Sequence, residues 1–413
     1  MAVVRPFRAI RPTGELASKV AALPYDVMNS EEARQMVVGN PYSFLHVDKA
    51  EIDLDPSIDH YDKKVYQKAR ENLDKMSADG VYIQDEKPCF YLYKQVMDGR
   101  SQVGIVGCAS IDDYMNNVIK KHELTRADKE EDRVNHVDYC NANTGPIFLT
   151  YKARTAINAI VEKTMAAAPV YDFVSEGVQN TVWVITDEGD IQTIGKEFDA
   201  AGNLYIADGH HRCASAARVG KMRREQNPGY TGQEEFNYFL AVIFPDEQLH
   251  IMDYNRVVKD LNGMSDEQFM EKMKGLFHIK EYCGQGQYRP ESKHTFGMYL
   301  NDKWYILTAH GDIYDPNDPV DQLDVSILQK NVLDPLLGIK DPRTDSRIDF
   351  IGGIRGLSEL SRRVSEDMTV AFSMYATSIA ELLAVADAGL LMPPKSTWFE
   401  PKLRSGIFIH RLS

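Results

Sequence analysis

The run from Asp208 to Arg212, of sequence Asp-Gly-His-His-Arg, gathers a carboxylate, two imidazoles and a guanidinium. The apolar segment 204–207 precedes it and has strand character, and the Asp-Gly pair favours a turn. The residues that follow, 210–219, contain several alanines and neither Pro nor Gly, which predicts a helix. The sequence therefore predicts a corner at which a strand turns into a helix.

Such a corner has the chemistry to bind phosphate. Asp208 is a candidate N-cap, and the amides of a first helical turn carry partial positive charge that attracts anions. Arg212, one turn into the helix, would add a bidentate contact to phosphate oxygens. His210 and His211 point in different directions, so we expect at most one of them to face the ligand. The structural alternative is that Asp208 only caps the helix, the histidines pack or are solvated, and Arg212 pairs with a nearby carboxylate.

A second polar cluster, 120–126, has the sequence Lys-Lys-His-Glu-Leu-Thr-Arg. Lys121 and Arg126 would attract phosphate, and Glu123 would act as a general base or help to hold Mg²⁺. The charged run that follows, Asp128 to Arg133, is typical of a solvated helix face.

Three further segments carry weaker signals. The loop 143–149 (Asn-Thr-Gly-Pro-Ile-Phe-Leu) is interpreted as a plain connection into a strand. Asn255-Arg256 is a further candidate for a cationic contact to phosphate. Gly352 to Gly356 is rich in glycine but matches neither the Walker A nor the Rossmann spacing.

The elements around these motifs indicate an α/β chain with mixed sheets. Three hairpins are predicted from extended runs joined by turn residues, at 89–109, 181–194 and 294–308. Helices are predicted from Ser30, over 61–76, over 153–168 and over 209–224, and a buried strand over 239–244. Three hairpins favour antiparallel or mixed sheets.

The length of 413 residues favours two domains, which we place at 1–262 and 263–413, on either side of the polar turn at Asn262. The net charge of −14 disfavours a broad nucleic-acid interface. The five scattered cysteines indicate reduced thiols, and no stretch approaches the ~20 apolar residues of a membrane span. A cytoplasmic location is expected, and a homodimer is left open.

Several motifs together resemble one known family. They are Pro24-Tyr25-Asp26-Val27, Asn40-Pro41, His122 to Thr125, Asp208 to Arg212, and the closing segment 392–402 (Met-Pro-Pro-Lys-Ser-Thr-Trp-Phe-Glu-Pro-Lys). In these the chain resembles the Domain of Unknown Function 1015 family, essentially from end to end. Its central part also resembles the ParB/sulfiredoxin-like nucleotide-binding fold, of which the free-serine kinase is a member.

This resemblance implies that the run from Asp208 to Arg212, which we call the Asp208 box, binds nucleotide phosphates. It also implies that a glutamate earlier in the chain activates the acceptor hydroxyl, and Glu123 is the candidate for that glutamate. The resemblance and the residue chemistry together assign catalysis to Glu123, Asp208 and His210. The residues assigned to nucleotide and phosphate binding are Gly209, His211, Arg212, His122, Thr125 and Arg126. No metal ligands are assigned.

The function predicted on this basis is transfer of a phosphoryl group from ADP or ATP, with Mg²⁺, to a small hydroxyl metabolite, with free L-serine as the first candidate. A ParB-like nucleotide-binding regulator without a small-molecule product is the alternative. A sulfiredoxin-like reductase is a third hypothesis, and it would require Cys213, the cysteine nearest to the box, to be reactive.

Overall fold

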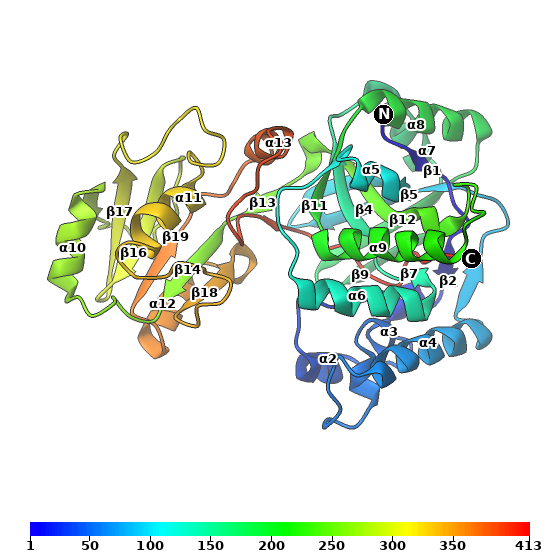
Figure 1. Ribbon diagram of the computed structural model, residues 1–413, viewed down its shortest axis with the longest axis horizontal. Helices are drawn as coiled ribbons and strands as arrows, with labels where there is room; N and C mark the ends of the chain where they lie inside the picture. Colours follow the sequence, from blue (N-terminus) through cyan, green and yellow to red (C-terminus); the bar gives the residue numbers. More distant parts are fainter. The chain divides into compact units, whose positions relative to one another are not determined.

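The computed structural model describes all residues from 1 to 413, and the chain divides into two compact units (Figure 1). The first unit comprises residues 1–249 together with the last segment, 401–413, and the second comprises residues 250–400. The boundary expected near Asn262 falls inside the second unit, between the strand β14 (Tyr254–Val258) and the helix α10 (Asp266–Lys274).

The first unit is built on a nine-stranded mixed sheet with the order β6-β11-β8-β12-β5-β4-β10-β9, to which β1 is added beside β5. Its strands are β6 (Ile119–Lys120), β11 (Leu204–Asp208), β8 (Ile147–Tyr151), β12 (Tyr238–Pro245), β5 (Arg100–Ser110), β4 (Phe90–Met97), β10 (Val178–Ile185), β9 (Tyr171–Ser175) and β1 (Val4–Arg5). The pairs β11/β6 and β12/β8 are parallel, and the other pairs are antiparallel. The predicted α/β class with mixed sheets is confirmed.

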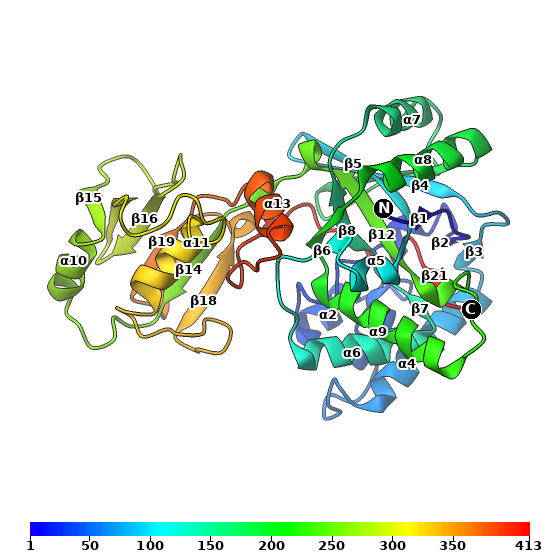
Figure 2. The same cartoon turned by 45° about the horizontal axis from the view of Figure 1, so that its top comes forward.

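Nine α-helices belong to this unit: α1 (Ala17–Val20), α2 (Ser30–Met36), α3 (Leu45–Asp48), α4 (Lys63–Ala78), α5 (Ile111–Met115), α6 (Ala127–Cys140), α7 (Thr155–Met165), α8 (Glu188–Ala201) and α9 (His210–Gln226). Helices α6 and α9 lie side by side in both views (Figures 1 and 2). Two small antiparallel sheets complete the unit, β2 (Ile10–Pro12) with β3 (Tyr82–Gln84) and β7 (Ala142–Asn143) with β21 (His410–Arg411).

Local sequence explains several of these elements. Helix α4 begins where the Asp62 side chain accepts a hydrogen bond from the Lys64 amide, and its buried residues Val65, Ala69 and Leu73 recur at helical spacing. The hairpin of β4 and β5 turns at Asp98 and Gly99, both in the left-handed region, with φ of 50° and 76°. Both of these predictions are confirmed.

The hairpin predicted at 181–194 is wrong. Strand β10 is present, but residues 191–194 lie in helix α8, because the side chain of Asp187 caps the helix by accepting a hydrogen bond from the Asp190 amide at 2.9 Å. The hairpin partner of β10 is the preceding strand β9, and the turn between them places Glu176 and Gly177 at positive φ.

The second unit contains a six-stranded antiparallel sheet with the order β15-β17-β16-β19-β14-β18. Besides β14, its strands are β15 (Phe277–Glu281), β16 (Thr295–Leu300), β17 (Lys303–Ala309), β18 (Ile348–Gly352) and β19 (Val370–Ser373). Its helices are α10, α11 (Asp324–Leu328), α12 (Ser358–Glu366) and α13 (Ile379–Asp387), and β13 (Ile251–Met252) pairs with β20 (Trp398–Phe399). The predicted hairpin of β16 and β17 is confirmed, with Asn301 and Asp302 at positive φ.

The glycine-rich run in the second unit has a packing explanation. A Cβ on Gly352 would lie 2.8 Å from the Trp398 ring, and one on Gly353 would lie 2.7 Å from Asp253 Oδ1. Close approach of these neighbours therefore requires glycine at both positions. None of the helices in the structure has the length and apolar composition needed to span a bilayer.

Candidate active site at the start of α9

The parallel pairing of β6 with β11 brings the two sequence clusters together. Leu204 and Tyr205 pair with Ile119 and Lys120, so the loop that leaves β6 lies beside the end of β11. Because both strands run in the same direction, His122 and Glu123 arrive at the same edge of the sheet as His210, the first residue of α9. The sheet topology thus assembles what the sequence separates by more than 80 residues.

The N-cap of α9 is Gly209 and not Asp208, which corrects the predicted capping role. Asp208 is the last residue of β11, and its Oδ1 accepts a hydrogen bond from the Gly209 amide at 2.8 Å. Gly209 has φ 92° and ψ 34°, a left-handed conformation that favours glycine, and no side chain caps the helix. The first turn of α9, a helix of 17 residues, therefore begins without a side-chain acceptor.

Asp208 also binds a lysine from the last segment of the chain. Its Oδ2 lies 3.2 Å from Lys402 Nζ, and both side chains are largely buried. Burial alone would raise the pKa of Asp208, but the charges of Lys402 and Arg212 outweigh that effect and hold the pKa well below its usual value. Asp208 is therefore an ionised carboxylate at neutral pH.

His122 and His210 form a buried pair of imidazoles. Their ring centroids are 4.5 Å apart and the planes are nearly perpendicular, and the two residues are only 2% and 6% exposed. Burial lowers the pKa of His122 to about 4 and that of His210 well below 6.5. Three ring nitrogens of this pair make no hydrogen bond: both nitrogens of His122 and the Nε2 of His210. The backbone of Ile206 lies near enough to His122 to favour its protonated form, but this effect is smaller than that of burial. Such unsatisfied nitrogens are uncommon in a protein interior and mark a polar site.

Glu123 lies at the open side of this pair. Its Oε2 is 3.8 Å from His210 Nδ1, and its side chain is 38% exposed. The structure thus places a partly exposed carboxylate beside a buried, neutral imidazole. That arrangement leaves Glu123 able to reach a ligand while His210 restricts its position.

The remaining predicted residues of the 120–126 cluster are engaged at the start of α6. The Arg126 amide donates a hydrogen bond to His211 Nε2 at 3.0 Å, whereas the Arg126 guanidinium pairs with Asp128 at the surface. The Thr125 hydroxyl donates to Glu130 Oε2 at 2.8 Å. His211 is therefore held by backbone of the second cluster, and the nucleotide-binding roles of Thr125 and Arg126 stay predictions.

Arg212 lies over the corner. A Cβ on Gly209 would be 3.1 Å from Arg212 Nε and from its Nη2, so the guanidinium covers the glycine closely. Its Nη1 donates a hydrogen bond to the Pro146 carbonyl, whereas its buried Nε has no partner. The structural alternative for Arg212, an ion pair with a carboxylate, is not found. No carboxylate oxygen lies within 4.0 Å of its guanidinium nitrogens, and the neighbouring Asp208 pairs with Lys402.

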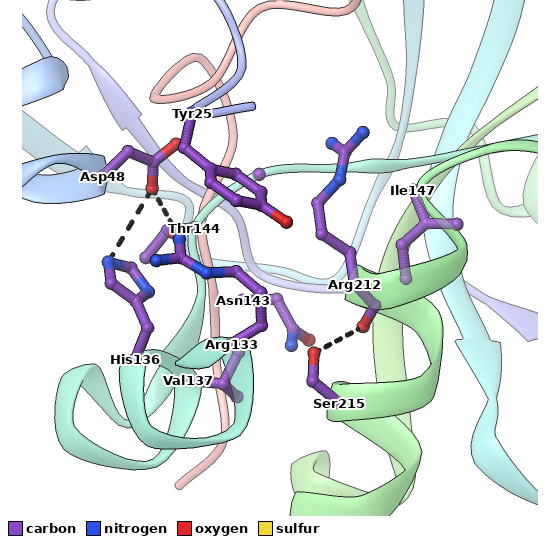
Figure 3. A pocket seen from close by; sticks show the side chains of 11 residues that line it. Tyr25, Asp48, Arg133, His136, Val137, Asn143, Thr144, Ile147, Arg212 and Ser215 are labelled. Atoms are coloured by element: carbon purple, nitrogen blue, oxygen red, sulfur yellow. Dashed lines mark hydrogen bonds and ion pairs between the residues drawn. The ribbon is translucent and has the colours of Figure 1, made fainter. Parts of the chain in front are cut away.

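A pocket that the sequence did not reveal adjoins Arg212 (Figure 3). It is a small hollow that opens to solvent. We call it the Tyr25 pocket, and it is lined by Tyr25, Asp48, Arg133, His136, Val137, Asn143, Thr144, Gly145, Ile147, Arg212 and Ser215. Residues 143–145 and Ile147 form part of its wall, so the segment 143–149, which the sequence predicts to be a plain connection, also shapes a pocket.

The charged run 128–133 is not wholly solvated, contrary to the prediction. Asp132 and Arg133 are buried, because Asp132 accepts a hydrogen bond from Tyr66 and pairs with Arg133 at 2.8 Å. The Arg133 guanidinium also stacks on the Tyr25 ring at 3.9 Å from its centroid. Tertiary partners on α4 and in the N-terminal segment thus bury one side of a helix whose first two turns are highly charged in sequence.

The hypothesis of a sulfiredoxin-like reductase finds little support in the structure. Cys213 is fully buried, and burial raises the pKa of its thiol well above the ordinary value, so it lacks the thiolate character that a reductase needs. No group of three or more His, Cys, Asp or Glu side chains is arranged to hold a metal ion.

Comparison with known proteins gives one family and several distant structures. The family model described as "Protein of unknown function (DUF1015)" matches residues 4–326. A search of curated proteins found no match.

Among solved structures, the chain is similar to a C-terminally truncated SbnI from Staphylococcus aureus, at 13% identity and a TM-score of 0.39, over 71% of this chain and 82% of that chain. It is similar to a conserved hypothetical protein from Pyrococcus furiosus, at 14% identity and a TM-score of 0.35, over 73% and 93% of the two chains. It is also similar to a free serine kinase in complex with AMP, at 14% identity and a TM-score of 0.36, over 72% and 90%. These likenesses are too distant to assign a role to any residue.

Proposed function

The chain belongs to the DUF1015 family of proteins of unknown function, and we propose that it is a nucleotide-dependent phosphotransferase that acts on the hydroxyl group of a small metabolite. ADP or ATP would be the donor. We further infer that the first unit has a ParB/sulfiredoxin-like core. The cytoplasmic location and the homodimer stay predictions.

The observation that carries this proposal is the corner formed by Gly209 and Arg212. A helix of 17 residues starts there without a side-chain cap, and a guanidinium with an unpartnered Nε covers the first turn. Helix N-termini and arginine both favour phosphate oxygens. Lys402 lies at the same corner, where its charge is matched by that of Asp208, so Arg212 supplies the positive charge for a phosphate.

Phosphoryl transfer asks a protein mainly for positioning and for neutralisation of charge. In the proposed step, the Glu123 carboxylate takes the proton of the acceptor hydroxyl as the hydroxyl oxygen bonds to the terminal phosphorus. The bond from that phosphorus to the bridging oxygen breaks, and the leaving AMP or ADP keeps the electron pair. His210, neutral and 3.8 Å from Glu123, orients the base without protonating it.

Mg²⁺ would accompany the nucleotide. This ion keeps several waters and is usually held by one or two carboxylates together with substrate phosphates. Of the two carboxylates at the corner, Glu123 would help to hold the ion, because Asp208 is engaged by the Gly209 amide and by Lys402.

Free L-serine is the first acceptor to test. The purified protein would be incubated with ADP or ATP, Mg²⁺ and a panel of hydroxy amino acids, hydroxy acids and polyols, and phosphorylated products would be detected by ³¹P NMR and mass spectrometry. We expect one acceptor to yield a phosphate monoester. Absence of both nucleotide binding and product across the panel would refute the proposal.

The regulatory alternative makes a different prediction. A ParB-like reader should shift duplex DNA in a gel at low salt, whereas a metabolite kinase with a net charge of −14 should not. Nucleotide binding accompanied by a DNA shift and no phosphoryl product would favour the regulator.

A further inference from the structure

The Arg212 guanidinium belongs to two sites at once. Its Nε and Nη2 lie against Gly209 at the phosphate corner, whereas its Nη1 is 3.6 Å from the position of a Cβ on Gly145, in the wall of the Tyr25 pocket. A molecule in that pocket would therefore sit next to a phosphoryl group bound at the corner. This is where an acceptor must be placed.

We infer that the Tyr25 pocket binds the zwitterionic end of a free α-amino acid, with the carboxylate toward Arg212 and Tyr25 and the ammonium toward Asp48. The inference rests on the proposed function, since it makes this amino acid the phosphoryl acceptor. The acceptor is thus defined by its carboxylate and its ammonium group. The hydroxyl on the side chain of the amino acid would then face the corner formed by Gly209 and Arg212.

The pocket holds one charge of each sign close to Gly145. A Cβ on Gly145 would be 3.6 Å from Arg212 Nη1 and 3.9 Å from Asp48 Oδ2. Asp48 is 5% exposed, and its Oδ1 accepts a hydrogen bond from Thr144 at 2.9 Å. The other carboxylate oxygen is the one directed toward Gly145, which suits an ammonium ligand.

The third charged group of the lining, Arg133, is paired with Asp132, which lies outside the lining. Arg212 and Asp48 are therefore left as one charge of each sign to face a ligand. His136 adds no charge, because burial and the neighbouring Arg133 lower its pKa below 6.5. A phosphate dianion would call for surplus positive charge, whereas a zwitterion matches a balanced set.

Tyr25 supplies a neutral hydroxyl on the carboxylate side. Burial, with the nearby Asp26, raises the pKa of Tyr25 well above its ordinary value, so the phenol keeps its proton. Its hydroxyl is directed toward the Arg212 side chain (Figure 3). A phenol and a guanidinium together bind a carboxylate well.

The absence of a side chain at Gly145 keeps the space open. An alanine there would place a methyl group within 4 Å of both Arg212 and Asp48 without removing either charge. It would also approach Ser405 Oγ to 3.0 Å, a contact that a small rotation of that hydroxyl relieves. Gly145→Ala is therefore a way to fill the proposed site selectively.

The first experiment measures binding by isothermal titration calorimetry, with L-serine, L-alanine, glycerate and ethanolamine as probes. We expect L-serine and L-alanine to bind, and glycerate and ethanolamine, which each lack one charged group, to bind at least about tenfold more weakly. Equal binding of glycerate or ethanolamine, or no binding of either amino acid, would overturn the inference.

The second experiment repeats the titration with Asp48→Asn and Gly145→Ala, using Gly229→Ala as control, because a Cβ on Gly229 meets nothing within 4 Å. Each of the two site variants should lose about 10- to 100-fold in L-alanine affinity and the control none, with folding checked by circular dichroism. Unchanged L-alanine affinity in the folded site variants would refute the assignment.

L-alanine separates this inference from the proposed function, since it has no hydroxyl to phosphorylate. Binding of L-alanine without a phosphoryl product from any amino acid would leave the pocket standing and refute the phosphotransferase. A product from a polyol without amino-acid binding would do the reverse.

Discussion

Lys402 Nζ lies 3.2 Å from Asp208 Oδ2, although the two residues are 194 positions apart. The lysine belongs to the short segment 401–413, which returns to the first unit after the chain has built the second. The same segment bonds to Gln95 through the Lys402 carbonyl. The corner formed by Asp208, Gly209 and Arg212 thus includes a residue from the segment 401–413.

Replacing Lys402 should therefore weaken both the fold and nucleotide binding. In Lys402→Met, Asp208 keeps its partial burial but loses its cation, and we expect a cost of about 1–3 kcal/mol in the free energy of unfolding at pH 7. Because the pKa of Asp208 in the folded protein is depressed, this contribution is present above the unfolded value of about 3.9 and disappears as the pH falls through the folded value. Urea denaturation at pH 7 and at a series of pH values below 3.9 measures it.

A double-mutant cycle with Asp208→Asn provides the control. If the two side chains act as a pair, the double variant should lose less than the sum of the single variants. Additive losses would show that the ion pair contributes nothing.

Glu123→Gln tests the proposed base. The amide keeps the size of the side chain but cannot take a proton, so turnover should fall by ~10² to ~10⁴ while nucleotide affinity stays nearly unchanged. Glu131→Gln is the control, because Glu131 pairs with Arg218 at the surface, outside the corner. Equal turnover in the two variants, measured in the same coupled assay, would remove Glu123 from catalysis.

The His122 ring makes stability depend on pH. Its folded pKa of about 4 lies below the unfolded value of about 6.5, so the unfolded chain binds more protons in that window and the folded state loses stability as the pH falls from 6.5 to 4. The loss from His122 should reach up to about 3 kcal/mol. His122→Phe should abolish this part of the pH dependence, as seen by urea denaturation at successive pH values. Parallel curves for wild type and variant would contradict it.

The corner could be predicted from sequence because its signals are local. An apolar run, an Asp-Gly turn and an alanine-rich stretch specify β11, Gly209 and α9 without reference to the rest of the chain. The hairpin at Asp98 and Gly99 was predictable for the same reason. The N-cap was misassigned by one residue, since the sequence does not show that Asp208 completes the strand.

The Tyr25 pocket could not be predicted, because it depends on tertiary pairing. The Thr144 hydroxyl bonds to Asp48 across 96 residues, and Arg133 stacks on Tyr25 from a different part of the unit. A charged run such as 128–133 is solvated in most helices, and only its neighbours in space bury Asp132 and Arg133 here. The apolar residues Val134 and Val137 within the same helix were the one available hint of a buried side.

In the second unit, Asp324 should make the protein less stable as the pH rises. Burial raises its pKa to about 7, against about 3.9 when unfolded, so its contribution is present below pH 3.9 and is lost as the pH rises through 7. Its Oδ1 accepts a hydrogen bond from the His294 amide at 2.8 Å, which an asparagine would retain. Asp324→Asn should be more stable than wild type at pH 8 by as much as about 4 kcal/mol, and nearly equal at pH 4.

Hydrogen exchange of β16 and α11 localises this effect to the second unit, which matters because a chain of two units need not unfold in a single step. The nearby Glu381 disfavours ionisation of Asp324, and Lys293, which pairs with Glu381 at 2.7 Å, favours it. Slower exchange in the variant at pH 8 is the expected result, and faster exchange would show that the carboxylate is ionised and stabilising.

Alanine substitutions at Gly209 and at Gly177 separate two effects on nucleotide affinity, displacement of Arg212 and backbone strain. Both glycines have positive φ, of 92° and 75°, so alanine at either position should cost about 1 kcal/mol in unfolding free energy. Only at Gly209 would the new Cβ meet the guanidinium, at 3.1 Å from Nε, whereas at Gly177 it meets nothing within 4 Å. Gly209→Ala should therefore weaken nucleotide binding about 10- to 100-fold through displacement of Arg212, and Gly177→Ala should leave it unchanged. Calorimetric titration with ADP measures both, and equal affinities in the two variants would mean that the guanidinium does not bind the phosphates.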